Sequence, residues 1–251
     1  MSSIRQAAPL KNNPFFILLS VILLTIANCQ VSFAQRVEPM VFELAASGSK
    51  STTSLRVNNN KSAPLTIEVI PSRISLDEHG KETRTLAEDD FLIYPPQTIL
   101  QPGKTQVIKV KYVGDPTIEA SQAYRISVNQ VPVNLGLDES SSLGLLLNFN
   151  TLANVVPAKA KSELNVTDIK LGTDGNWVVT IKNSGNRFAR LSQTKWTAAS
   201  TSDSGNKKSF KKEEVNNMID KKLVLPNSTL ITNVKAIDGF SPENTTITIT
   251  N

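Results

Sequence analysis

The stretch FLIYPPQTILQPGKTQVIKVKYVG, residues Phe91–Gly114, is dominated by β-strand and turn signals. The pair Pro95-Pro96 interrupts an apolar run, and Pro102-Gly103 marks a turn. After the turn, apolar and polar residues alternate along the chain: Val107, Lys109 and Lys111 on one face, and Ile108, Val110 and Tyr112 on the other. Such alternation predicts a strand with one exposed and one buried face.

Similar strand signals surround this stretch on both sides. Upstream lie VEPMVFELAA, TTSLRVNNN and APLTIEVIPSRISL, and DEHGKE around Gly80 has the composition of a hairpin tip. Downstream, AYRISVNQVPV ends at Pro132, and an acidic, serine-rich loop around Asp138 follows. The total of about seven strands in roughly 120 residues is typical of an immunoglobulin-like sandwich.

The sequence changes character after Pro157. AKAKSE has the composition of a short charged linker, and Asp174-Gly175 predicts a hairpin turn in the segment that follows. Further strand patterns continue to NTTITITN at the end, while KKSFKKEE at Lys207–Glu214 is interpreted as a solvated loop. We therefore expect an all-β chain with two immunoglobulin-like domains, residues 35–157 and 158–251.

Residues 1–34 have the pattern of an export signal. Arg5 and Lys11 precede an apolar stretch, and small residues before Ala34 predict cleavage after that residue and export of the mature chain. Lipidation of Cys29, the only cysteine, is the alternative. Cleavage leaves 25 basic against 22 acidic residues, a net charge of +3, which is too small to indicate nucleic-acid binding.

No pattern in the sequence indicates catalysis. The single histidine, His79, lies in a predicted turn, and Glu88–Asp90 has the pattern of a loop before a strand. The sequence also has no phosphate-binding glycine loop, nucleophile elbow or cluster with metal-ligand spacing. We expect a binding protein without cofactor or metal rather than an enzyme.

The stretch SSSLGLLLNFNTL, Ser140–Leu152, is apolar on both faces of the strand that it predicts. A strand buried only within its own domain would alternate apolar and polar residues. The pattern indicates that the second face packs against something else.

Phe91–Pro116, together with QAYRISVNQVP at Gln122–Pro132, resembles the periplasmic chaperones of the chaperone–usher pilus pathway, the PapD-like family. NSGNRFARL at Asn183–Leu191 is similar to a stretch of that family's second domain. The resemblance implies two domains in an L, no enzymatic activity, and two partners: pilin-like subunits with an incomplete fold and an outer-membrane usher.

In this family the last strand of the first domain completes the fold of an unfinished subunit, by β-strand addition. The resemblance assigns this donor strand to residues of one parity, with Phe149 as an extension: Ser141, Leu143, Leu145, Leu147 and Phe149. Leu146, of opposite parity, is expected to face the chaperone's own sandwich. Self-association of the subunit-free protein is left open.

The family also uses basic residues to bind the subunit's C-terminal carboxylate. The two usual positions fall near Pro39 and Leu152, where this sequence has no basic residue. The resemblance then points to Lys109, with Lys111 equally placed, and to the divergent branch sometimes called archaic. A lysine there would form a charge-assisted hydrogen bond. The remaining alternatives are Arg36, Arg56 and Arg125.

Two other functions are compatible with a two-domain β protein. One is a structural pilus or surface-adhesion subunit, although a complete first domain argues against it. The other is a carbohydrate-binding module, which needs exposed aromatic residues. Aromatic residues make up only 6% of the chain, and Trp177 and Trp196 are expected in the core or in hairpins.

Overall fold

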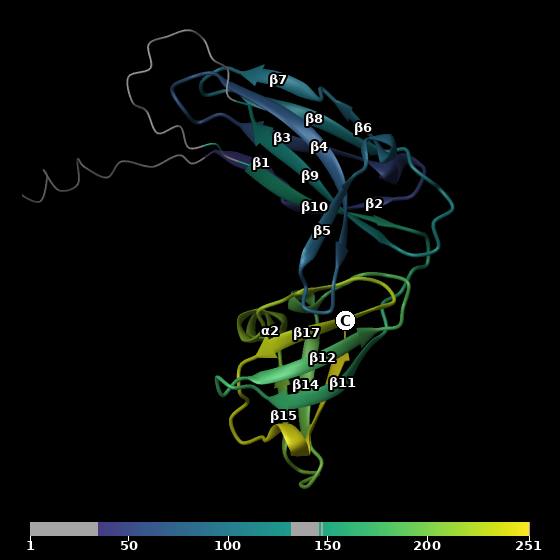
Figure 1. Cartoon of the computed structure of the whole chain (residues 1–251), viewed down its shortest axis with the longest axis vertical. Coiled ribbons are helices and arrows are strands. Elements are labelled where there is room, and N and C mark those ends of the chain that lie inside the picture. The colour runs from purple at the N-terminus through teal and green to yellow at the C-terminus, as the bar shows by residue number, and fades with distance from the viewer. Residues whose placement is uncertain (1–34, 132–145, 147, 251) are drawn as a thin grey trace, which may run out of the picture. The chain divides into compact units, whose positions relative to one another are not determined.

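The structure, a computed structural model, describes residues 35–131, 146 and 148–250, and its regular structure is almost entirely β. Two sheets form the first sandwich (Figure 1). The first sheet is antiparallel, with its strands in this order: β1 (Arg36–Glu38), β3 (Thr52–Asn58), β8 (Thr105–Tyr112) and β6 (Phe91–Tyr94). The second sheet has this order: β2 (Val41–Ala45), β10 (Asn148–Val156), β9 (Gln122–Gln130), β4 (Leu65–Leu76) and β5 (Glu82–Leu86), with β7 (Gln97–Leu100) also pairing with β4.

The core of the first sandwich lies between these two sheets. Alternate residues of β8 point into it, so that Ile108 and Val110 are fully buried while Lys109 and Lys111 are exposed. Tyr124 of β9 is also fully buried, and its ring packs edge-on against Phe91 at 4.9 Å between centroids. The predicted alternation of β8 is therefore confirmed.

The first sandwich contains more strands than the sequence predicted. Its described residues form ten strands rather than about seven. One segment that reads as a single strand is divided by proline at Pro39, between β1 and β2, and the strand break predicted at Pro95-Pro96 is confirmed between β6 and β7. Proline has no backbone N–H to donate to a strand ladder, so pairing stops there and resumes with a different partner strand.

The second sandwich follows from Leu164. Its strands form three small sheets: β11 (Leu164–Leu171), β12 (Trp177–Asn183) and β17 (Ser228–Val234) in the first, β13 (Ala189–Arg190) and β16 (Leu223–Val224) in the second, and β15 (Lys207–Phe210), β14 (Lys195–Ser200) and β18 (Thr245–Thr250) in the third. Trp177 and Trp196 are 2% and 1% exposed, which confirms that both tryptophans belong to the core.

The prediction of a solvated loop at Lys207–Glu214 is wrong. The segment forms β15 and the beginning of a short helix, α2 (Lys212–Met218). Phe210 and Val215 are buried in the second core, and these two apolar residues fix the segment despite its surrounding charges. The helix is capped where the backbone N–H of Lys211 donates to Glu214 Oε2 at 2.7 Å.

Residues Gln35–Asn251 form one compact unit. An apolar cluster joins its two sandwiches, where Leu152 of β10 packs with Leu223 and Leu225. At the tip of the β4–β5 hairpin, the N–H of Ile231 donates to the carbonyl of Glu78 at 2.6 Å. None of the described helices has the length and apolar character needed to cross a membrane.

Candidate functional site

Strand β10 is covered by neighbouring strands over only part of its length. On one side it pairs antiparallel with β9 from Asn148 onward. On the other side β2 runs parallel to it, but this pairing begins only at Leu152, opposite Val41. Among the described residues, Asn148–Thr151 thus has a strand neighbour on one side only. Unpaired backbone groups of this kind can accept a further strand.

The residues of β10 alternate between two apolar environments. Phe149, Ala153 and Val155 pack against the core of the first sandwich, with Phe149 partly buried. Leu152 lies on the opposite face, in the cluster that joins the two sandwiches. Because β-strand side chains alternate with a period of two, the odd-numbered Ala153 and Val155 point into the first core, and Phe149 lies at its border.

Most of the predicted donor residues cannot be placed. Four of them lie outside the described residues: Ser141, Leu143, Leu145 and Leu147. Phe149 is described, and it packs at the border of the core of the first sandwich. The expectation that Leu146 faces its own sandwich is wrong, since its side chain is 49% exposed. Leu146 lies outside strand β10, whose described residues are Asn148–Val156.

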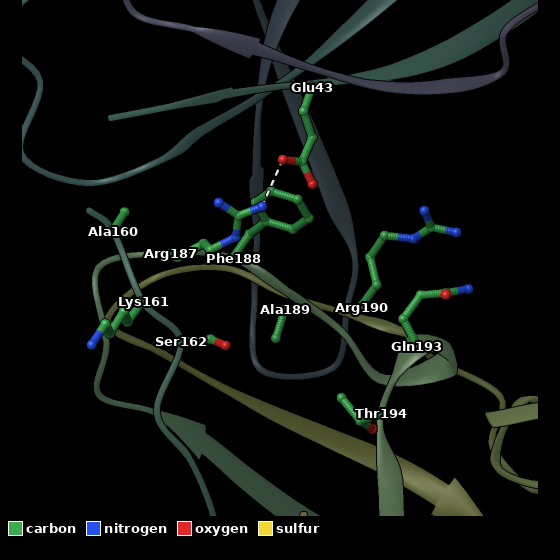
Figure 2. A pocket seen from close by; sticks show the side chains of 10 residues that line it. All are labelled: Glu43, Ala160, Lys161, Ser162, Arg187, Phe188, Ala189, Arg190, Gln193 and Thr194. Carbon is green, nitrogen blue, oxygen red and sulfur yellow. Dashed lines mark hydrogen bonds and ion pairs between the residues drawn. The ribbon is translucent and has the colours of Figure 1, made fainter. Parts of the chain in front are cut away.

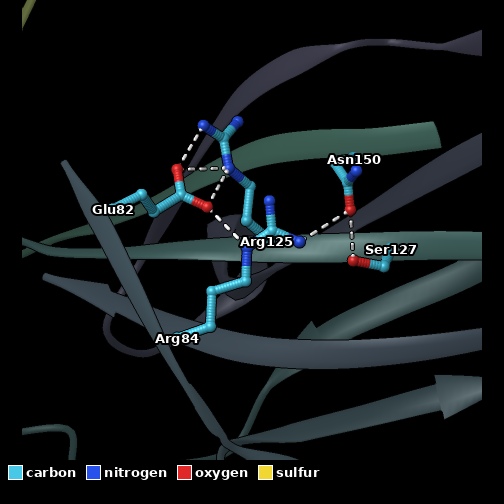
Figure 3. A network of polar contacts seen from close by, with 5 residues as sticks. All are labelled: Glu82, Arg84, Arg125, Ser127 and Asn150. Carbon is cyan, nitrogen blue, oxygen red and sulfur yellow. Dashed lines mark hydrogen bonds and ion pairs between the residues drawn. The ribbon is translucent and has the colours of Figure 1, made fainter. Parts of the chain in front are cut away.

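A polar network holds the open part of β10 from the outer face of its sheet (Figure 3). Asn150 Oδ1 accepts hydrogen bonds from Ser127 Oγ of β9 at 2.7 Å and from Arg84 Nη1 of β5 at 3.0 Å. Glu82 binds Arg84 Nε at 2.6 Å and Arg125 Nη2 at 2.6 Å. Burial disfavours the ionised form of Glu82, but the hydrogen bonds from Arg125 and Arg84 outweigh it and hold its pKa below the usual value.

Lys109 and Lys111 lie far from this edge in the topology of the sandwich. They project from β8 of the first sheet, on the face opposite to the buried Ile108 and Val110. β10 belongs to the second sheet, and the core lies between the two. The structure does not bring these lysines together with the described part of β10, and their role as carboxylate anchors stays a prediction.

Another basic site lies beside β2 and the segment between β12 and β14. A pocket of about 620 Å³ is lined by Glu43 of β2 together with residues of the second sandwich (Figure 2). Arg187 donates from Nη2 to Glu43 Oε2 at 2.6 Å, and its guanidinium carbon lies 5.4 Å from the ring centre of Phe188. The buried Phe188 is fixed in turn, because its N–H donates to Ser121 Oγ at 2.7 Å.

The pocket carries more positive than negative charge. Lys161, Arg187 and Arg190 line it, against the single carboxylate of Glu43. Within the described part of the chain, neither Lys161 nor Arg190 has an ion-pair partner for its side chain. Several donors around one opening suit the binding of a carboxylate, for which arginine offers two parallel hydrogen bonds.

The family follows from two comparisons. Residues 37–156 match the model of the PapD N-terminal domain, described as a pili and flagellar-assembly chaperone. The whole described fold is similar to that of the class 5 fimbriae chaperone CfaA, with a TM-score of 0.56 and 16% sequence identity over 86% of this chain and 98% of the other. The first sandwich therefore belongs to the PapD N-terminal domain family, and the whole described fold is similar to that of the PapD-like chaperones. No relative was found among curated proteins.

Two further structures share the PapD-like fold, both solved as complexes. One is the CsuC–CsuE chaperone–tip adhesion subunit complex from archaic Csu pili of Acinetobacter baumannii, with a TM-score of 0.51 and 13% identity over 82% of this chain and 91% of the other. The second is the Salmonella enterica SafA pilin in complex with the SafB chaperone, with a TM-score of 0.53 and 13% identity over 83% and 87%. Class 5 and archaic chaperones match alike, so membership of the archaic branch stays a prediction.

The basic pocket was not predicted from the sequence, although one stretch of the sequence contains several of the residues that line it. Arg187, Phe188 and Arg190 all lie within NSGNRFARL, the stretch whose resemblance to the family's second domain was noted. Their convergence with Glu43 could not be read from spacing, because 144 residues separate Glu43 from Arg187.

Proposed function

We propose that this PapD-like chaperone binds pilin-like subunits by lending them the edge of β10, continued through Leu147, Leu145, Leu143 and Ser141. The observation that supports the proposal is the one-sided pairing of Asn148–Thr151. A subunit that lacks its last strand has an open groove, in which the donor's backbone would pair and its alternate side chains would fill pockets.

The expected binding free energy is that of a temporary complex. Burying three leucine side chains contributes roughly 5–9 kcal/mol. The loss of translational and rotational freedom on association, together with ordering of the strand, offsets much of this. We therefore expect a complex that is stable yet displaceable by the next subunit's extension, so that delivery to an outer-membrane usher needs no nucleotide and no enzymatic step.

The second element of the proposal is the carboxylate anchor. We assign the subunit's C-terminal carboxylate to the pocket lined by Lys161, Arg187 and Arg190, which contains the cations that this chain lacks at the family's usual positions. Lys109 and Lys111 are the competing assignment from the sequence. The two assignments differ in which substitution weakens the complex.

The donor strand is tested by matched substitutions of neighbouring leucines. Leu145→Asp should leave the free protein folded but abolish recovery of a co-expressed pilin-like subunit in a periplasmic pull-down. Leu146→Asp adds the same charge one position along, at a side chain that is already half exposed, and should be tolerated. Equal recovery with both variants would contradict the donor-strand assignment.

We further propose that the mature protein acts in the periplasm after cleavage behind Ala34. Cleavage would remove Cys29 and leave a chain without thiols. Intact-mass measurement of the periplasmic protein checks this, and a lipid-modified N-terminus at Cys29 would show the alternative processing.

A further inference from the structure

The proposed binding of a subunit does not make use of the polar network beside β10. Asn148–Thr151 lacks a strand neighbour on one side, so its position depends on β9 and on side chains. Phe149 packs against the first core, and Thr151 Oγ1 donates to the carbonyl of Ile126 on β9 at 2.9 Å. Asn150 adds polar contacts on the outer face, since its Oδ1 accepts hydrogen bonds from Ser127 at 2.7 Å and from Arg84 at 3.0 Å.

The two donors to Asn150 differ in origin. Ser127 stands directly opposite Asn150 in the β9–β10 register, so its hydrogen bond adds to contacts that the pairing already makes. Arg84 comes from β5, two strands beyond β9 in the sheet order, and makes a contact that strand pairing does not provide. It holds the open segment from outside the β9–β10 pair.

Arg84 is itself held in place. Its Nε lies 2.6 Å from Glu82 Oε1, and the same carboxylate is fixed by Arg125 through contacts of 2.6–3.2 Å. Glu82 is only 19% exposed, so this arrangement is partly shielded from solvent. A side chain with fixed partners loses little further conformational freedom when it holds a neighbour.

We propose that Arg84 is a positioning residue for the lending edge: through Asn150 it holds Asn148–Thr151 in the extended conformation that a subunit would meet. The functional meaning of this contact rests on the proposed function, whereas the contact itself is a property of the free protein. A strand that is ordered before binding avoids part of the entropy cost of association.

Hydrogen exchange of the free, full-length protein tests this inference. In Arg84→Gln, amide exchange in peptides spanning Asn148–Thr151 should become about fivefold faster, the effect of one lost hydrogen bond. Asn150→Ala should do the same, and the double variant should exchange no faster than Asn150→Ala alone. Asn150→Asp keeps the acceptor oxygen and should retain the slow exchange.

Arg56→Gln is the matched control, because Arg56 lies exposed on β3 of the other sheet with no side-chain partner among the described residues. It should leave exchange at Asn148–Thr151 unchanged, and exchange across β12 should stay constant in every variant as the measure of folding. The inference is overturned if Arg84→Gln behaves like Arg56→Gln, or if the effects of Arg84→Gln and Asn150→Ala multiply in the double variant.

The outcome is separable from that of the proposed function. If Leu145→Asp abolishes subunit recovery but Arg84→Gln does not alter exchange, the donor-strand assignment is supported and the positioning role of Arg84 is refuted. If Arg84→Gln speeds exchange but the unmodified protein stabilises no subunit, the positioning contact is supported and the proposed function is refuted.

Discussion

Arg187→Gln and Glu43→Gln break the same ion pair, yet they should change subunit binding in opposite directions. In the free protein the two side chains bind each other at 2.6 Å in the basic pocket. Arg187→Gln removes a donor that would bind the subunit's carboxylate. Glu43→Gln removes an anion that repels this carboxylate and at the same time releases the guanidinium from its partner.

The exposure of the pair sets the magnitudes. Arg187 and Glu43 are 34% and 48% exposed, and an ion pair with that much solvent contact contributes at most about 1 kcal/mol to stability. Both variants should therefore lower the free energy of unfolding by less than about 1 kcal/mol. A charge-assisted hydrogen bond contributes about 1.5–3 kcal/mol, and in a solvated pocket the lower value applies, so Arg187→Gln should weaken binding about tenfold.

Glu43→Gln should have the smaller effect, of opposite sign. Two like charges about 4 Å apart in water repel by about 1 kcal/mol, so removing one should tighten the complex about fivefold. Dissociation half-lives of purified chaperone–subunit complexes measure both changes, with Lys109→Gln as the matched control on β8. A change of the same sign in both pocket variants would refute the reasoning, and so would a loss that follows Lys109→Gln instead of Arg187→Gln.

Three further predictions concern stability. The folded pKa of Glu82 lies below its ordinary value of 4.5, so the stability that it contributes is complete above about pH 4.5 and is lost as the pH falls through the folded pKa. In Glu82→Gln the free energy of unfolding, measured with urea at a series of pH values, should therefore fall less steeply on the acid side. Tyr124→Phe removes a buried hydroxyl that donates to Asp90 at 2.9 Å and should cost about 1–2 kcal/mol in urea unfolding, while a change below about 0.5 kcal/mol would show that the hydrogen bond is not formed. Asn154 is fully buried, and neither polar atom of its side-chain amide has a partner among the described residues, so Asn154→Leu should raise the free energy of unfolding by about 1 kcal/mol, and a decrease would reveal an internal partner for the amide.

The fold was predictable from the sequence where neighbouring residues determine the structure. The alternation around Lys109 predicted which face of β8 is buried, and Asp174-Gly175 predicted the turn between β11 and β12. Periodicity was less informative where pairing partners are distant, as at Pro39, which divides one apparent strand between two sheets. In Lys207–Glu214 the many charges concealed Phe210, whose burial depends on a core assembled from remote strands.

The candidate site divides in the same way. The run that ends at Phe149 showed its apolar character in the sequence itself. The basic pocket did not, because its charges come from segments that only tertiary folding brings together, with Glu43 on β2 and Arg187 beyond β12. Knowing which face of a strand is exposed does not identify the residue that binds the carboxylate. Lys109 lies on an exposed strand face, but that face belongs to the sheet that does not contain β10.

The position at which β2 begins to pair with β10 determines how much of β10 has a strand neighbour on one side only. β1 pairs with β3 in the first sheet, and after Pro39 the chain crosses to the second sheet, where the N–H of Leu152 donates to the carbonyl of Met40 at 2.8 Å. Had β1 continued in its own sheet, β10 would be open along its whole length, and a long unpaired edge promotes aggregation. Had β2 begun pairing four residues earlier along β10, it would occupy the side of Asn148–Thr151 that the proposed strand addition requires. The crossover therefore protects the half of β10 that builds the chaperone's own core and leaves open only the half that leads into the leucine-rich stretch.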